Sequence, residues 1–230
     1  MRAAFLIIDV QKDYFKNGLF PIKKAKEIIP IINKIKNDYP NKFTSIYISQ
    51  IKKDPDHISL KESSLLKDEN LHIDKLTENL KGKFPKFCIK DTEGSQLNEE
   101  IILNGNEFFI NKNEDKLKEE ISCFSNKNFI ENLKENKIQI IFICGLTLDF
   151  CVGLTALNSS KFGFETYVIR EGVKSYNEES GKSMEKNLEK NNVKIINMEQ
   201  FEEIIKKVEK EKEKKDDEVK DNGEEEKKVE

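Results

Sequence analysis

The class of fold follows from one stretch of the chain, Ile143-Cys144-Gly145-Leu146-Thr147-Leu148-Asp149-Phe150-Cys151-Val152. An apolar, strand-like run stops at Gly145, and Cys151 falls within the first turn of the helical pattern that follows. Backbone N–H groups and the positive end of a helix dipole favour a thiolate over a thiol. We therefore expect a strand-to-helix turn that presents Cys151 as a nucleophile with a lowered pKa. The alternative is that Cys151 is a small buried hydrophobic residue, as most unpaired cysteines are.

Apolar runs rich in β-branched residues recur along the chain and alternate with amphipathic segments. We expect strands at residues 3–10, 43–49, 87–90, 107–110, 138–143, 165–169 and 193–196. We expect helices at residues 23–37, 126–136, 149–161 and 178–190. This alternation predicts a three-layer α/β/α fold, with a doubly wound, mainly parallel sheet. The polar residues 50–87 interrupt the alternation, and we interpret them as a long loop over the active-site end.

The length of 230 residues suits one α/β domain with a short extension. We assign residues 1–205 to this domain. Residues 206–230 hold 9 lysines and 11 acidic residues with almost no apolar side chains. Such a segment cannot bury enough surface to offset the entropy of ordering it, so we expect a charged, disordered tail.

The charge balance argues against several classes of protein. Lysine and arginine number 40 and the acidic residues 43, the two signs are interleaved, and only Arg2 and Arg170 are arginines. We therefore expect no nucleic-acid partner. No apolar run has the length of a membrane span, and the four cysteines have neither paired spacing nor the density of a disulfide scaffold. We expect a cytoplasmic protein that acts on a small molecule.

Three chemically useful residues follow predicted strands: Asp9, Lys112 and Cys151. Ligands of doubly wound sheets bind beyond the carboxyl ends of the strands, so these side chains are expected to share one crevice. Together they would supply a base, a cation and a nucleophile. Taken singly, Asp9 could merely cap a turn, and Lys112 is one surface-type residue among many. No GxGxxG motif follows the first strand and no P-loop occurs, so dinucleotide or P-loop chemistry is not indicated.

These motifs together resemble the isochorismatase-like cysteine hydrolases, and among them the nicotinamidase branch. The resemblance extends from Ala3 to about Phe201. It rests on Asp9-Val10-Gln11, on Lys112 with Ser122-Cys123-Phe124 downstream, and on the stretch around Cys151. Two further segments match: Pro55-Asp56-His57-Ile58-Ser59 and Phe84-Pro85-Lys86-Phe87-Cys88-Ile89-Lys90-Asp91-Thr92-Glu93-Gly94-Ser95.

The resemblance implies a catalytic triad of Asp9, Lys112 and Cys151. It implies hydrolysis of nicotinamide to nicotinate and ammonia through a Cys151 thioester, which would serve NAD salvage. Backbone N–H groups of Thr147 and Cys151 would form the oxyanion hole. A cis peptide bond is expected at Leu146–Thr147. The pyridine ring would lie against the aromatic residues Tyr14, Phe84 and Phe150.

The family's metal site is where the sequence departs from the pattern. Nicotinamidases hold zinc or iron near the pyridine nitrogen, but the corresponding positions here are Ile51, Lys53 and Phe87. Isoleucine and phenylalanine have no donor atom, and a lysine would have to lose its proton, so we expect no metal cofactor.

The sequence offers two alternatives to the family's metal site. A shifted site built from Asp54, Asp56, His57 or His72 is one alternative, although these residues lack ligand spacing. By position alone, the ammonium of Lys53 is a candidate replacement for the charge of the metal.

Three functions remain open on the sequence. The first is a nicotinamidase, a hydrolase of linear amide C–N bonds. The second is a metal-independent amidase of the same superfamily that acts on another small amide, ureide or carbamoyl compound. The third is a catalytically inactive family member that binds a ligand. The resemblance also implies a possible homo-oligomer.

Overall fold

The computed structural model describes residues 1–68 and 71–208, and these residues form one sheet whose neighbouring strands are all parallel. The order of the strands is β3-β2-β1-β4-β5-β6. Their bounds are β1 Ala3–Ile8, β2 Ser45–Ile51, β3 Glu107–Lys112, β4 Ile140–Leu146, β5 Glu165–Lys174 and β6 Val193–Ile196. The doubly wound parallel sheet predicted from the alternation of strands and helices is confirmed.

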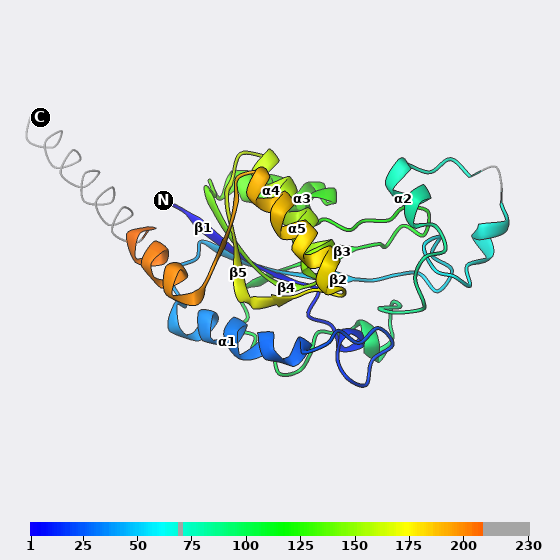
Figure 1. The fold of residues 1–230 in the computed structure, drawn as a ribbon, viewed down its shortest axis with the longest axis horizontal. Helices are drawn as coiled ribbons and strands as arrows, with labels where there is room; N and C mark the ends of the chain where they lie inside the picture. Colours follow the sequence, from blue (N-terminus) through cyan, green and yellow to red (C-terminus); the bar gives the residue numbers. More distant parts are fainter. Residues whose placement is uncertain (69–70, 209–230) are drawn as a thin grey trace, which may run out of the picture.

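Helices cover both faces of the sheet (Figure 1). α1 (Ile28–Asp38) lies on one face together with a helix at residues 198–208, and α3 (Lys127–Glu135), α4 (Gly153–Lys161) and α5 (Glu178–Lys190) lie on the other. Every residue of the central strands β1 and β4 is buried. Burial from both sides is why these strands are continuous apolar runs rather than alternating ones.

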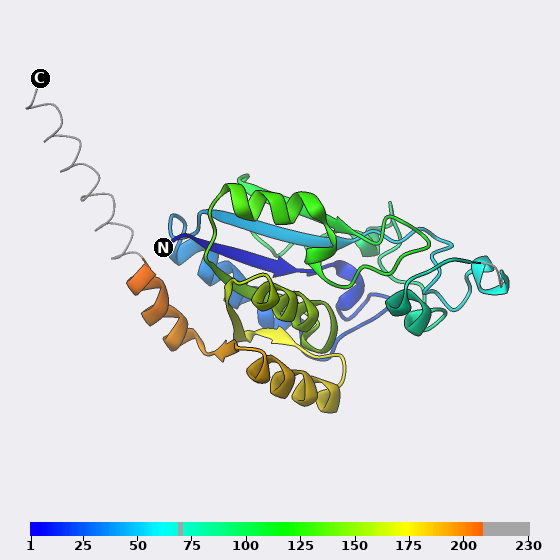
Figure 2. The ribbon, with the colours of Figure 1, turned by 90° about the horizontal axis from the view of Figure 1, so that it is seen from above.

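The segment between β2 and β3 extends past the carboxyl ends of the strands (Figure 2). It contains a short helix, α2 (Lys75–Leu80), where a loop was expected. The Asp74 carboxylate accepts a hydrogen bond from the N–H of Thr77 at 2.9 Å and caps this helix.

The strand predicted at residues 87–90 is wrong. Only an isolated bridge joins Lys53 to Ile89 there. The apolar residues Phe87 and Cys88 are buried by loop packing around the site, so their hydrophobicity does not mark a strand.

The boundary expected at residue 205 falls inside a helix at residues 198–208. Phe201, Ile205 and Val208 are buried on one side of the helix at residues 198–208. The rest of the expected tail, residues 209–230, lies outside the described residues.

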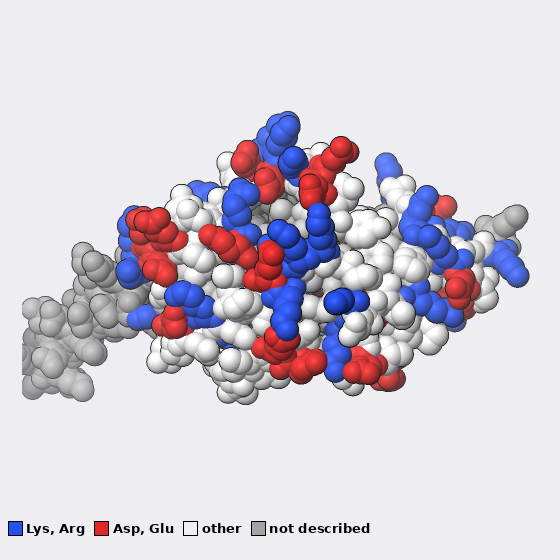
Figure 3. Space-filling model, turned by 60° about the horizontal axis from the view of Figure 1, so that its bottom comes forward, with Lys and Arg blue, Asp and Glu red and all other residues white. Residues whose placement is uncertain are grey.

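No helix in the described part of the chain is both long and apolar enough to cross a membrane. Lysines alternate with acidic residues over the face in Figure 3.

Candidate active site

Three strand ends deliver the residues of the site to one place. Asp9 follows β1, Lys112 is the last residue of β3, and Cys151 lies just after β4. Strand order reverses between β1 and β4, because β2 and β3 continue on one side of β1 and β5 and β6 on the other side of β4. This reversal opens the crevice in which ligands of such sheets bind.

Asp9 is fully buried and its carboxylate is held by two donors. Ser49 Oγ donates to Oδ1 at 2.6 Å, and Lys112 Nζ donates to Oδ2 at 2.7 Å. The backbone of Asp9 is left-handed, with a φ of 47°. Aspartate is one of the few residue types that adopt this conformation readily. The turn therefore aims the carboxylate back across the ends of β1 and β2.

Lys112 is a buried cation with two oxygen partners. Besides Asp9, its ammonium donates to the carbonyl of Ile121 at 2.8 Å. Burial alone would lower the pKa of Lys112, but the charge of Asp9 and its hydrogen bond to the ammonium act in the opposite direction, and the net pKa is raised. The Lys112 side chain is therefore an ammonium at neutral pH.

Cys151 is buried, and its thiol is close enough to Asp9 and Lys112 for both to act on its pKa. Burial raises the pKa of the Cys151 thiol well above its ordinary value; Lys112 lowers it and Asp9 raises it further. The expectation that the helix start lowers this pKa is wrong, because desolvation of the thiolate outweighs the favourable charges. The resting form of Cys151 is the thiol, next to a carboxylate that can accept its proton.

The turn before Cys151 is built from unusual backbone geometry. The peptide bond Leu146–Thr147 is cis, as expected. One π-helical turn, Leu148–Val152, precedes α4, and the N–H groups of Phe150 and Val152 both donate to the carbonyl of Thr147. Thr147 and Cys151, the expected oxyanion-hole residues, therefore flank a single tight turn at the end of β4.

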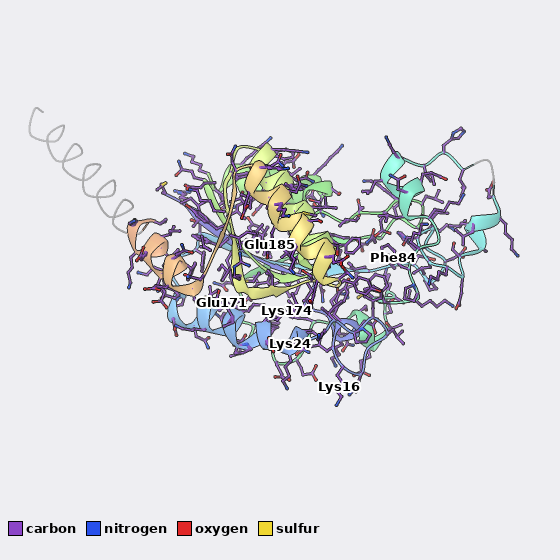
Figure 4. The ribbon with its side chains drawn as sticks, viewed as in Figure 1. Lys16, Lys24, Phe84, Glu171, Lys174 and Glu185 are labelled. Carbon is purple, nitrogen blue, oxygen red and sulfur yellow. The ribbon has the colours of Figure 1, made fainter. Side chains whose placement is uncertain are left out.

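Aromatic rings form a wall beside this turn. Of the ring residues expected, Phe84 packs edge-on against Phe150, and Tyr14 contacts Phe87 with ring centroids 5.8 Å apart. Phe20 stacks on Phe87 with centroids 4.9 Å apart. The side chain of Phe84 lies beyond the strand ends, toward the segment that carries α2 (Figure 4).

Several neighbours of the site were not predicted. Ser49 bonds to Asp9, and Phe20 also stacks on Tyr176 with centroids 4.9 Å apart. Asp149 accepts hydrogen bonds from the N–H groups of Tyr176 and Asn177, so it fixes the loop that carries Tyr176. Ser49 could have been recognised as a site residue, because it is a polar residue at the end of the apolar strand predicted at residues 43–49. No local pattern marks Phe20 or Tyr176, because loops distant in sequence bring them together.

The three positions of the family's metal site hold no ligand set. Ile51 N–H and carbonyl both bond to the side chain of Gln11, and its own side chain is buried. Phe87 belongs to the aromatic wall. Lys53 is fully buried, and its protonated amine has no lone pair with which to bind a metal ion.

The residues considered for a shifted metal site do not form a ligand cluster either. One carboxylate oxygen of Asp54 accepts the N–H of Asp56, and the Asp56 carboxylate is directed to Ser64, where the side-chain hydroxyl donates to it at 2.6 Å. Both ring nitrogens of His57 are engaged: Nδ1 accepts the N–H of Ser59 and Nε2 faces the carbonyl of Lys118. No group of three His, Cys, Asp or Glu side chains in residues 1–68 and 71–208 could hold a metal ion. The described residues therefore do not fit a divalent metal.

Comparison with known proteins finds relatives of this chain in one family. The model of the isochorismatase domain matches residues 3–200. A nicotinamidase of Acinetobacter baylyi is 28% identical over 178 residues, which cover 75% of this chain and 81% of the relative. A nicotinamidase of Escherichia coli is 22% identical over 181 residues, which cover 76% of this chain and 84% of the relative.

Solved structures agree with these relatives. The pyrazinamidase of Pyrococcus horikoshii in complex with zinc has a TM-score of 0.75 and 25% identity, and the match covers 86% of this chain and all of that one. A nicotinamidase and pyrazinamidase of Acinetobacter baumanii has a TM-score of 0.76 at 22% identity, over 87% of this chain and 98% of that one; it supports the fold alone.

Proposed function

The chain belongs to the isochorismatase family, and on that premise we propose that it is an amidase that hydrolyses nicotinamide to nicotinate and ammonia. The observation that carries the proposal is the buried ion pair of Asp9 and Lys112, with Cys151 close to it, at the switch point of the sheet. A base, a cation and a thiol that lie close together are the parts that nucleophilic amide hydrolysis needs. The nicotinamidase relatives support an amide substrate.

The first step is formation of the nucleophile. The Cys151 thiol gives its proton to the Asp9 carboxylate as Sγ attacks the amide carbon. Because the pKa of the thiol is raised by burial, proton transfer accompanies attack instead of preceding it. Lys112 stays charged and offsets the negative charge that moves from Asp9 to the sulfur and then to the substrate.

The second step is collapse of the tetrahedral intermediate. The N–H groups of Thr147 and Cys151 donate to the oxyanion. Asp9 returns the proton to the amide nitrogen, the C–N bond breaks, and ammonia leaves a thioester on Cys151. Asp9, again a carboxylate, takes a proton from water, the hydroxide adds to the thioester carbon, and the acid leaves as the proton returns to sulfur. Each bond that breaks is matched by one that forms.

The aromatic wall supplies the site for the ring. A flat pyridine packs well against ring faces and edges. Tyr14, Phe84 and Phe150 are the residues that we assign to substrate binding.

The four cysteines are free thiols, which supports a reducing compartment such as the cytoplasm.

A second candidate is an amidase of the same family with another small amide as substrate. The observation that favours it is that Ile51, Lys53 and Phe87 stand at the positions where the resemblance implies metal ligands, since this replaces the group that would hold the pyridine nitrogen. The triad would work in the same way on a ureide or a carbamoyl compound.

Ammonia release by the purified protein tests the proposal. Wild-type protein is expected to release ammonia from nicotinamide, and Cys151→Ala is expected to release none. A panel of small amides, ureides and carbamoyl compounds is run in parallel. Turnover of one of these without turnover of nicotinamide would select the second candidate, and no turnover of any compound would contradict both.

A further inference from the structure

Lys53 is a fully buried ammonium in the wall of the candidate pocket. Its Nζ lies 4.7 Å from the centre of the Phe84 ring and 4.6 Å from that of Phe87. Both distances are within the range of a cation–π contact. The same rings belong to the aromatic wall that we assign to the substrate, so the ammonium faces the ring-binding region.

The charge of Lys53 is balanced by a buried acid. Nζ donates to Ser59 Oγ at 2.8 Å and to Glu119 Oε2 at 3.3 Å. His57, which contacts Ser59 and Glu119, is kept neutral, because burial and the nearby Lys53 lower its pKa. The cluster is therefore one ion pair with no net charge, which disfavours an anionic ligand and favours a neutral hydrogen-bond acceptor.

The ammonium has a donor to spare. A lysine ammonium has three N–H donors, and Ser59 and Glu119 account for two. For the third, the described residues provide only the faces of Phe84 and Phe87. A buried N–H without an oxygen or nitrogen partner gains substantially when a ligand acceptor reaches it.

Lys53 is also close to the reacting thiol. The Phe84 ring that Nζ contacts packs against Phe150, the residue directly before Cys151. Burial lowers the pKa of Lys53, and the charge of Glu119 raises it in part. The aromatic wall thus connects the surroundings of the donor with those of the nucleophile.

We propose that Lys53 is a specificity-determining residue that donates a hydrogen bond to an acceptor on the ring of an aromatic carboxamide. This inference rests on the proposed amidase function. The fixed ammonium selects a ring with an unprotonated nitrogen, such as pyridine, over a ring without one, and it does so with no metal bound. Glu119 and Ser59 are positioning residues that hold Nζ in place.

Removal of Lys53 alone would leave Glu119 as an unpaired buried charge, so the variant that tests the proposal removes both charges. Lys53→Met/Glu119→Gln is compared with a matched variant, Lys36→Met/Glu107→Gln. Lys36 and Glu107 also form a buried ion pair, but it lies at the amino-terminal end of β3, far from the site. The matched variant controls for the general effect of deleting a buried pair.

Binding of nicotinamide and benzamide is measured by calorimetry in a Cys151→Ala background, and turnover of both is measured with Cys151 intact. Wild type is expected to prefer nicotinamide about 10- to 100-fold, the effect of one hydrogen bond from a charged donor. Lys53→Met/Glu119→Gln is expected to lose this preference while benzamide is bound as before. The matched variant is expected to keep the preference. Dialysis against a chelator is expected to leave turnover unchanged.

The outcomes separate the two proposals. Wild-type protein that hydrolyses nicotinamide but does not prefer it to benzamide would overturn the role of Lys53 alone. So would an undiminished preference in Lys53→Met/Glu119→Gln, or turnover that is lost on chelation and restored by zinc. Wild-type protein that neither binds nor hydrolyses nicotinamide would overturn the proposed function, and this inference with it.

Discussion

Asp9 combines a demanding backbone conformation with a buried ion pair. Its left-handed φ favours aspartate or asparagine, and its carboxylate neutralises the Lys112 ammonium, which has no solvent to stabilise it. Loss of one partner of such a pair costs about 3–5 kcal/mol. The residue is therefore constrained by structure as well as by the chemistry that we assign to it.

Asp9→Asn separates these two constraints. Asparagine tolerates the left-handed backbone and keeps an oxygen for Lys112, but it cannot accept the thiol proton. We expect kcat to fall about 10²- to 10⁴-fold, the usual contribution of a general base. Steady-state ammonia release checks this, with circular dichroism to confirm folding. A folded variant with wild-type kcat would remove Asp9 from the chemistry.

The raised pKa of Cys151 has a consequence for its reactivity. Because the folded pKa lies above the ordinary value of a cysteine, the thiolate fraction at neutral pH is smaller than in a free thiol. We expect alkylation of Cys151 by iodoacetamide to accelerate steadily as pH rises into the alkaline range. Mass spectrometry of the Cys151 peptide follows the reaction, with Cys151→Ala as control. A rate that is already constant below neutral pH would show a resting thiolate.

Positions at strand ends, together with the family resemblance, predicted that Asp9, Lys112 and Cys151 converge; the strand ends alone did not single out Lys112. The pKa of Cys151 was not predictable, because local sequence shows the helix start but not how completely loops exclude water from the thiol. Glu119 and Ser59 were missed for the same reason. Their role depends on contact with Lys53. Glu119 is 66 residues from Lys53 in the chain, and Ser59, which is 6 residues away, reaches Lys53 through an irregular loop.

At the scale of elements, β1 and β4 approach each other closely where the crevice begins. Gly145 has a φ of +126°, and a Cβ at this position would lie 2.1 Å from the carbonyl oxygen of Ile8. Backbone cannot move aside as a flexible side chain can. The glycine thus permits the pairing of β1 and β4 directly before Asp9 and Thr147.

Gly145→Ala is expected to lower the free energy of unfolding by about 2 kcal/mol or more, through overpacking and an unfavourable φ. Gly163→Ala is the matched control, because Gly163 also has a positive φ but nothing lies within 4 Å of its missing Cβ. It should cost only about 1–2 kcal/mol. Urea unfolding followed by circular dichroism measures both. Equal losses would show that the contact with Ile8 is unimportant.

Regular elements were predictable where periodicity was strong. Residues 178–190 were predicted as a helix and form α5 with the same bounds. Residues 87–90 were misassigned because a short apolar run does not distinguish a strand from a buried loop. The polar segment before them concealed α2, whose six residues are too few for a recognisable amphipathic pattern.

At the scale of the whole molecule, the helix at residues 198–208 completes the layer that contains α1. Phe201 is fully buried and contacts Tyr39, Phe43 and Phe142. Tyr39 and Phe43 lie in the connection between α1 and β2, and Phe142 lies in β4. The position of Phe201 therefore links the last described helix to the centre of the sheet.

Phe201→Ala is expected to lower the free energy of unfolding by about 3–5 kcal/mol, through lost burial and a residual cavity. Phe162→Ala is the control, because Phe162 is 49% exposed. It should cost much less. Urea denaturation compares the two variants with wild type. Similar losses in both would mean that the helix at residues 198–208 is not part of the cooperative core.

The central claim is that Cys151 carries the acyl group of an amide substrate. The most direct measurement is mass spectrometry of protein that has been mixed with nicotinamide and quenched in acid within the first turnovers. We predict a mass increase equal to a nicotinoyl group on the peptide that contains Cys151, and none in Cys151→Ala. Undiminished ammonia release by Cys151→Ala, with no adduct on the wild-type peptide, would contradict it.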